Sequence, residues 1–313
     1  MEPLFFEPDF KERIWGGERL RDFGYNPPYP QTGECWAFAA HSNGNSRVRN
    51  GELNGLSLND LWEGNRGLFG NIECDRFPLL IKILDACDDL SVQVHPDDTY
   101  ARENENGELG KTECWYIIDC EEGAEIIYGH QAKTKEELQL MVANREWDRL
   151  LRRIPVKCGD FFMVPSGTIH AIGKGIVILE TQQNSDTTYR VYDYDRKDKD
   201  GNLRELHIER SLAVATVPSI DPKVEPLIQV KDGVTVTTYV QNEYFTVHKW
   251  EVDGQATLQQ RKPFKLVSVL NGNGTLLKDK KEYSFKKGDH FLLPHGFDEF
   301  NLVGKAEMIV SHL

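Results

Sequence analysis

Short stretches in which apolar and polar residues alternate recur along most of this chain, and they predict a mainly β protein. From residue 219 onward, glycine-containing turns separate the alternating stretches, as is typical of an all-β segment. A helical spacing of apolar residues, or a helix-capping residue before them, occurs in few places. We expect three short helices there, at 57–63, 134–151 and 207–216.

One strand–turn unit occurs twice in the chain. In each copy a Gly-Asp pair stands six residues before a Pro-x-Gly turn, first at 159–167 and again at 288–296. The first copy continues to His170, and the equivalent position in the second copy is Glu299. Two copies of one unit imply two related β-barrels, of which only the first kept an imidazole.

The best boundary between the two barrels is the segment 217–219. We therefore expect a first domain over 1–218, with a helical insert near 134–151, and a second domain over 219–313. The charged run 193–206 is typical of a solvated turn. The second domain carries no metal-ligand set of its own, so we expect it to bind no metal and to serve packing.

Polar residues that could bind a metal lie on or beside the predicted strands. Gln93 and His95 are two apart in an alternating run, so they are expected to share one face. Glu113 opens a second strand, which we expect to pair with the first across the loop 97–110. A lone strand histidine is usually structural, but His170 adds a second imidazole. These four nitrogen and oxygen ligands would suit an open, catalytic type of metal site, and a carboxylate beside an imidazole suits zinc, manganese or iron.

Composition and charge limit the classes of function. The 313 residues include 39% hydrophobic and 28% charged residues, as in ordinary globular proteins, and no apolar run is long enough to span a membrane. The net charge of −13 argues against binding of nucleic acid. Six cysteines without a C-x-x-C pair, and an N-terminus unlike a signal peptide, indicate a reducing cytoplasm. The sequence does not indicate an oligomeric state.

The segment from Gly159 to His170 resembles the second cupin motif. Most of residues 1–215, and more weakly the C-terminal barrel, resembles type I mannose-6-phosphate isomerases of the shorter bacterial form. The chain departs from the family in having Lys-Thr-Glu where Lys-Pro-Glu is common, and a short helical insert in place of a helical domain. The residues that carry the resemblance are Gln93-Val-His95-Pro-Asp, Lys111-Thr-Glu113, Pro-x-Gly-x-x-His170-Ala, Glu180, and Asn184-Ser-Asp186 leading to Arg190.

This resemblance implies two cupin-like jelly-roll β-barrels and a zinc-dependent isomerase of mannose 6-phosphate and fructose 6-phosphate. It also implies one zinc per chain, a small phosphorylated sugar as the partner, and Arg190 as a catalytic residue. The zinc ligands that it implies are Gln93, His95, Glu113 and His170.

The chemistry of such an isomerase suggests roles for further residues. A proton moves between adjacent carbons through a cis-enediol, and Arg190 could stabilise the developing charge from the wall opposite the metal. Lys111 and Glu180 are both candidates for the base, and the sequence does not decide between them. For the substrate phosphate we expect Lys82, Lys111 and Arg190, with a hydroxyl from Ser91.

Two other classes of protein fit the same ligands. A non-catalytic metal cupin, with a sugar-sensing or structural role, would use the metal to stiffen the barrel. An iron-dependent cupin oxygenase would need two histidines, a carboxylate and open positions, which this set also offers. Analysis of the bound metal would separate these classes, because zinc without a visible spectrum favours the isomerase.

Overall fold

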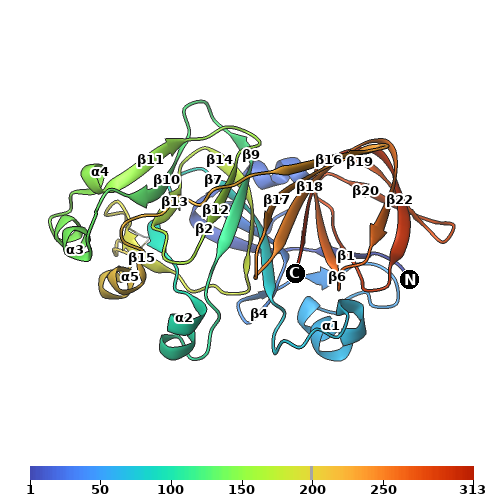
Figure 1. Cartoon of the computed structure of the whole chain (residues 1–313), viewed down its shortest axis with the longest axis horizontal. Helices are drawn as coiled ribbons and strands as arrows, with labels where there is room; N and C mark the ends of the chain where they lie inside the picture. The colour runs from blue at the N-terminus through green and yellow to red at the C-terminus, as the bar shows by residue number, and fades with distance from the viewer. Residues whose placement is uncertain (198–199) are drawn as a thin grey trace.

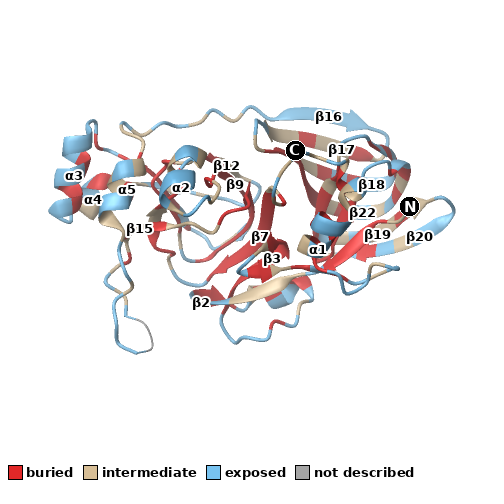
Figure 2. Ribbon diagram, turned by 90° about the horizontal axis from the view of Figure 1, so that it is seen from below, coloured by how far each residue is buried: buried red, intermediate tan, exposed pale blue. Residues whose placement is uncertain are grey.

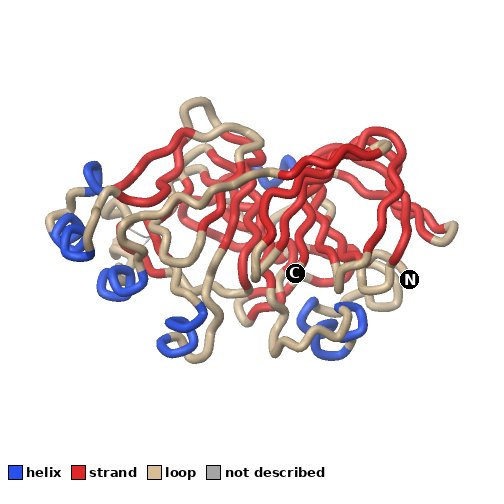
Figure 3. The backbone as a smooth tube through the Cα atoms, in the orientation of Figure 1, coloured by secondary structure: helices blue, strands red, loops and turns tan. Residues whose placement is uncertain are grey.

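The computed structural model describes residues 1–197 and 200–313, so two positions of the charged run, 198 and 199, lie outside the described residues. Two β units lie beside one another, and strands are the main regular element of both, with long loops in the N-terminal unit (Figures 1 and 3). The prediction of a mainly β, jelly-roll architecture is confirmed. No helix among the described residues is both long enough and apolar enough to cross a membrane.

The N-terminal unit is built from two main sheets that face each other. One sheet has the strand order β12 (Phe161–Val164), β9 (Glu113–Cys120), β14 (Ile176–Gln183), β7 (Leu79–Ala86), β2 (Asp9–Gly17) and β3 (Thr32–Phe38). The other has the order β11 (Leu151–Pro155), β10 (Glu125–His130), β13 (His170–Ile172), β8 (Val92–Val94) and β15 (Tyr189–Tyr192). A small hairpin, β4 (Ala40–His41) and β5 (Gly44–Asn45), adjoins them.

Apolar side chains from both sheets share one buried cluster, which includes Trp115 of β9 and Ile172 of β13. Strands β8 and β9 therefore lie in opposed sheets, and the prediction that they pair with each other is wrong. The loop between them, which contains α2 (Asp98–Asn104), crosses from one sheet to the other. Alternation specifies which face of a strand is buried, but it does not specify the neighbouring strand.

The C-terminal unit contains one nine-stranded sheet around an apolar core. Its order is β16 (Leu227–Lys231), β17 (Val234–Gln241), β18 (Thr246–Gln260), β22 (Asp298–His312), β19 (Lys265–Lys278), β21 (His290–Leu293), β1 (Leu4–Glu7) and β6 (Arg47–Val48), with β20 (Lys281–Lys286) beside β19. The N-terminal strand β1 thus completes the sheet of the other half of the chain. The boundary predicted at 217–219 stays a prediction.

The repeated sequence unit corresponds to a repeated arrangement of strands. The order β12–β9–β14–β7 of the first unit matches β21–β19–β22–β18 of the second. In both, the strand that ends before the Pro-x-Gly turn pairs with the start of its neighbour. Val164 lies opposite Glu113 in the first unit, and Leu293 lies opposite Lys265 in the second. The glycines that open the two copies, Gly159 and Gly288, share a φ of 88° that favours glycine.

Helices are short and peripheral, and they lie mostly at the end of the N-terminal unit (Figure 2). Ser57 caps α1 (Leu58–Gly64) as predicted, and α5 (Ile208–Val214) occupies the third predicted segment. The prediction of a single helix over 134–151 is wrong, because the backbone leaves the helical conformation at Arg145, which has a φ of 58°. The segment forms α3 (Lys135–Ala143) and α4 (Trp147–Leu150), and two 3-10 helices, η1 (Arg19–Phe23) and η2 (Arg66–Phe69), occur elsewhere.

Candidate metal centre and active site

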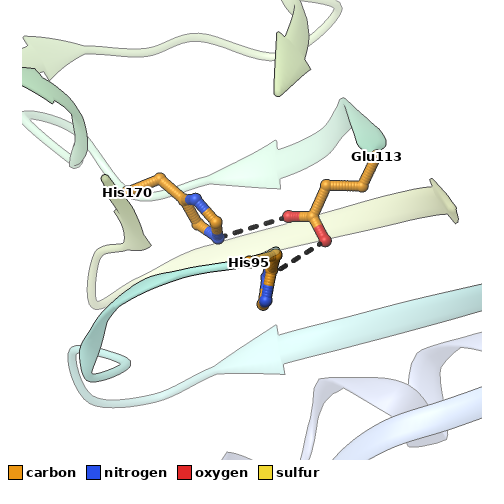
Figure 4. Close-up of side chains that lie close together, drawn as sticks. All are labelled: His95, Glu113 and His170. Atoms are coloured by element: carbon orange, nitrogen blue, oxygen red, sulfur yellow. Dashed lines mark ion pairs between the residues drawn. The ribbon is translucent and has the colours of Figure 1, made fainter. Parts of the chain in front are cut away.

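Three of the predicted metal ligands meet inside the N-terminal unit. His95 follows β8 and His170 begins the adjacent β13, whereas Glu113 begins β9 on the opposed sheet. Candidate ligand atoms of all three lie within 4.8 Å of one another. The Glu113 carboxylate lies 3.5 Å from His95 Nε2 and 3.4 Å from His170 Nε2 (Figure 4). All three residues are buried.

Hydrogen bonds to the backbone orient both imidazoles toward this point. His95 Nδ1 lies 2.9 Å from the carbonyl of Thr187, and His170 Nδ1 lies 2.9 Å from that of Thr168. Because a carbonyl can only accept, each Nδ1 must donate, which leaves the Nε2 lone pair directed at Glu113. His170 Nε2 is buried and has no hydrogen-bond partner. A buried acceptor without a donor is costly, and a metal cation would satisfy it.

Both histidines are in the protonation state that a metal requires. Burial, with Lys111 and His170 nearby, holds the pKa of His95 well below its usual value. Burial lowers the pKa of His170 to about 4. Two neutral imidazoles and one carboxylate form a donor set that fits zinc.

Lys111 lies against this group. Its Nζ is 3.1 Å from Glu113 Oε2 and 3.3 Å from His95 Nε2. Burial would lower the pKa of Lys111, but Glu113 and Glu180 outweigh it and raise the pKa above the usual value. Lys111 is therefore a firmly charged ammonium in this arrangement.

A cavity of about 240 Å³ adjoins the metal group. The residues predicted to bind the substrate line it, together with the candidate base Glu180 and the fourth predicted metal ligand. They are Lys82, Ser91, Gln93, Lys111, Glu180 and Arg190. A larger cavity of about 480 Å³ lies between the two units, but it contains none of the predicted ligands.

Arg190 lies in the same row of the five-stranded sheet as two predicted ligands. Gln93 of β8 is opposite His170 on one side and Arg190 of β15 on the other. Side chains opposite each other on antiparallel strands point to the same face. The expectation that Arg190 faces the metal from the opposite wall is therefore wrong, because it shares the wall of His170. Its Nε donates to Ser91 Oγ at 3.3 Å, which orients the guanidinium beside the cavity.

The opposite wall carries an ion network that the sequence analysis found only in part. Lys82 Nζ lies 3.6 Å from Glu180 and 3.6 Å from Glu34. Glu34 also accepts hydrogen bonds from Trp36 Nε1 at 2.5 Å and Arg13 Nε at 2.6 Å. Burial alone would raise the pKa of Glu34, but Lys82 and Arg13 outweigh it and lower the pKa to about 2.

Glu34, Arg13 and Arg204 are lining residues that the sequence reasoning missed. Glu34 could have been found in the same way as Lys82, because each is a charged residue within an apolar strand that proves fully buried. Arg204 lies in the charged run that was assigned to a solvated turn, and there no signal marked it.

Comparisons with known proteins agree with this site. The family described as "Phosphomannose isomerase type I, catalytic domain" matches residues 4–118, and "Mannose-6-phosphate isomerase, cupin domain" matches residues 235–313. Mannose-6-phosphate isomerase ManA of Bacillus subtilis strain 168 is 62% identical over 312 residues, covering 100% of this chain and 99% of its own length. A mannose-6-phosphate isomerase of Streptococcus mutans is 54% identical, covering 99% and 98%.

The same fold is found among solved structures. A crystal structure of the mannose 6-phosphate isomerase from Bacillus subtilis superposes with a TM-score of 0.99 at 54% identity, covering 100% of both chains. Family profiles, full-length relatives and fold thus agree, and the chain belongs to the type I mannose-6-phosphate isomerase family, which has the cupin fold.

Proposed function

We propose that this protein interconverts mannose 6-phosphate and fructose 6-phosphate through a cis-enediol, with one zinc ion held by Gln93, His95, Glu113 and His170. The observation that carries the proposal is the buried His–Glu–His group beside a cavity lined by charged side chains. The names of the relatives support the same reaction. A bound zinc would supply a Lewis acid for the sugar oxygens.

Within this proposal, the cations of the cavity hold the substrate. Arg190, Lys82 and Lys111 are charged groups that can receive the phosphate or the sugar oxygens, and the Ser91 hydroxyl lies beside Arg190. Arg190 also stabilises the charge that develops on the enediolate, because a planar guanidinium can donate two parallel hydrogen bonds. Several of the charged groups that line the cavity, among them Lys82, Lys111 and Glu180, are buried, which strengthens their interactions with a bound substrate.

Proton transfer between the two sugar carbons is assigned to Lys111 or Glu180. Lys111 lies nearer the metal group, but the neighbouring carboxylates favour its protonated form. Burial and Glu113 raise the pKa of Glu180, which is the direction that suits a base working near neutral pH. Replacing each in turn, as Lys111→Met and Glu180→Gln, and measuring exchange of the substrate carbon-bound proton with solvent would identify the base.

The overall proposal is tested by a coupled assay with purified protein and mannose 6-phosphate. We expect turnover that stops when a chelator removes the metal and returns when zinc is added. A metal-loaded, folded protein that does not convert this substrate would contradict the isomerase and favour a non-catalytic metal cupin. Metal analysis of the same sample should give about one zinc per chain. We also place the protein in the cytoplasm, which its six free thiols support.

A further inference from the structure

The two ends of the active-site cavity differ in charge. At the end near the metal group, the lysines lie beside carboxylates. Lys111 Nζ is 3.1 Å from Glu113. Lys82 Nζ is 3.6 Å from Glu34 and 3.6 Å from Glu180. A phosphate at this end would meet carboxylates that already compensate the lysines, and like charges repel one another.

The other end of the cavity carries two arginines, Arg190 and Arg204. Burial and the charge of Arg204 lower the pKa of Arg190, so the two guanidinium groups are close enough to repel each other. Arg190 donates hydrogen bonds to Ser91 Oγ at 3.3 Å and to the carbonyl of Glu205 at 2.7 Å. Within residues 1–197 and 200–313 it forms no ion pair with a carboxylate. A bound anion would offset the repulsion between the two arginines.

One buried carboxylate, that of Asp193, fixes the position of Arg204. Arg204 Nε donates to Asp193 Oδ2 at 2.7 Å, and Arg204 Nη2 donates to Asp193 Oδ1. This paired contact leaves Arg204 Nη1 without a hydrogen-bond partner among the described residues, so it can donate to a ligand in the cavity. Asp193 also accepts from Arg196 Nη2 at 2.6 Å. Because two arginines share this one carboxylate, it does not neutralise both of them.

Arg204 belongs to a segment that lies beyond Arg190 when the sheet is followed away from the metal group. The order across the sheet is His170 on β13, Gln93 on β8 and Arg190 on β15. The segment then follows the outer edge of β15, where His207 N donates to the Arg190 carbonyl at 2.8 Å. Neighbouring strands lie about 4.8 Å apart, so Arg190 is about 10 Å along the sheet from His170. In a hexose 6-phosphate the phosphate is likewise at the opposite end of the molecule from the two carbons that react.

We propose that Arg204 binds the phosphate group of the substrate, and that Asp193 is the positioning residue that holds Arg204 in the cavity. This inference rests on the proposed isomerase function and assigns different parts of the sugar to different cations. The phosphate lies at the arginine end of the cavity. Arg190, between Arg204 and the metal group, contacts the sugar oxygens on which charge develops. Asp193 acts only through Arg204.

The test is calorimetric binding of sorbitol 6-phosphate to the zinc-loaded, full-length protein. This ester has no carbonyl group and cannot be isomerised, so its binding is measured without turnover. Arg204→Met should weaken the binding about tenfold or more, because it removes a charge-assisted hydrogen bond, and the zinc content should not change. With mannose 6-phosphate, the same variant should raise KM more than it lowers kcat. Arg210→Met, at an exposed arginine paired with Glu105, is the matched control and should bind the ester as the wild type does.

Asp193→Asn separates the positioning role from a general contribution to the fold. It should also weaken binding of the ester, but Asp193→Asn combined with Arg204→Met should bind no more weakly than Arg204→Met alone. Additive losses in the double variant would overturn the role of Asp193, and wild-type affinity in Arg204→Met would overturn the phosphate site. A protein that binds the ester through Arg204 but does not convert mannose 6-phosphate would support the phosphate site and contradict only the isomerase function.

Discussion

The two units share an order of strands but differ in what they bury. The sheet of the N-terminal unit places charged side chains inside the protein, among them Lys82, Glu113 and Glu180. At the equivalent positions of the C-terminal unit, Val310 replaces Glu180, whereas Lys265 and His248 replace Glu113 and Lys82. The rest of that core is aliphatic and aromatic. Buried charges are costly unless they are paired, whereas buried apolar area stabilises the fold directly. The N-terminal unit thus contains the candidate active site, whereas the C-terminal unit contributes mainly buried apolar area to stability.

The outer faces of the equivalent sheets join the two units. Cys114, Tyr116 and Leu179 of the first unit share a core with Leu266 and Ile309 of the second. Equivalent positions also meet in a buried hydrogen bond, in which Thr181 and Ser311 lie 3.0 Å apart between their hydroxyl oxygens. The apolar second copy therefore supports the polar first copy through a shared interface.

The largest expected effect is on the metal. His170→Ala should lose both zinc and activity while the fold persists, because it removes one ligand and leaves the apolar cores intact. His290→Ala, at a buried histidine of the C-terminal unit, is the matched control and should keep its zinc. Near-stoichiometric zinc retained by His170→Ala at neutral pH, measured by elemental analysis, would remove His170 from the ligand set.

The next effect is on stability and belongs to the C-terminal unit. Phe291 is fully buried and packs against Phe5 and Phe285, so Phe291→Ala should lower the free energy of unfolding by about 3–5 kcal/mol. Turnover per folded, zinc-bound molecule should remain unchanged. Denaturant unfolding together with kinetics below the transition checks this division, and a selective loss of turnover with unchanged stability would contradict it.

A smaller effect, on turnover alone, is expected at Arg190. Arg190→Lys keeps a charge but loses the planar fork, and loss of one preorganised donor costs about 100- to 1,000-fold. The loss should fall on kcat more than on KM, with the zinc content unchanged, because the charge is greatest in the transition state. Arg152→Lys, at a solvent-facing ion pair with Asp221, provides the control. Turnover of Arg190→Ala within about threefold of the wild type, far less than the loss of one donor, would exclude the role.

The smallest effect concerns the ion network of the N-terminal unit. The pKa of Glu34 is about 2 in the folded protein, below its usual value of 4.5. Its charge therefore stabilises the fold fully at pH values above the pKa that Glu34 has in the unfolded chain. That contribution is lost as the pH falls from about 4.5 toward 2. Glu34→Gln should lower the free energy of unfolding by about 1.5–3 kcal/mol at neutral pH, as for a hydrogen bond to a charged group. The difference from wild type should shrink with acid, and a constant difference across this range would contradict the role.

Several features of this protein were determined by its sequence alone. The alternating pattern placed Gln93 and His95 on one face, and the Pro-x-Gly turn marked His170. The repeated Gly-Asp and Pro-x-Gly unit predicted two related halves, which the strand order confirms. These features are local, because backbone alternation and turn chemistry depend on residues close together in the chain.

The tertiary structure decided which elements meet. It placed β8 and β9 in opposed sheets, added β1 to the sheet of the C-terminal unit, and set Arg190 on the wall of His170. It also brought Glu34, far from the ligands in sequence, against Lys82. The partner of a strand depends on packing between segments that are distant in the chain. A period of two residues along one strand carries no information about that partner, so only the folded arrangement could show it.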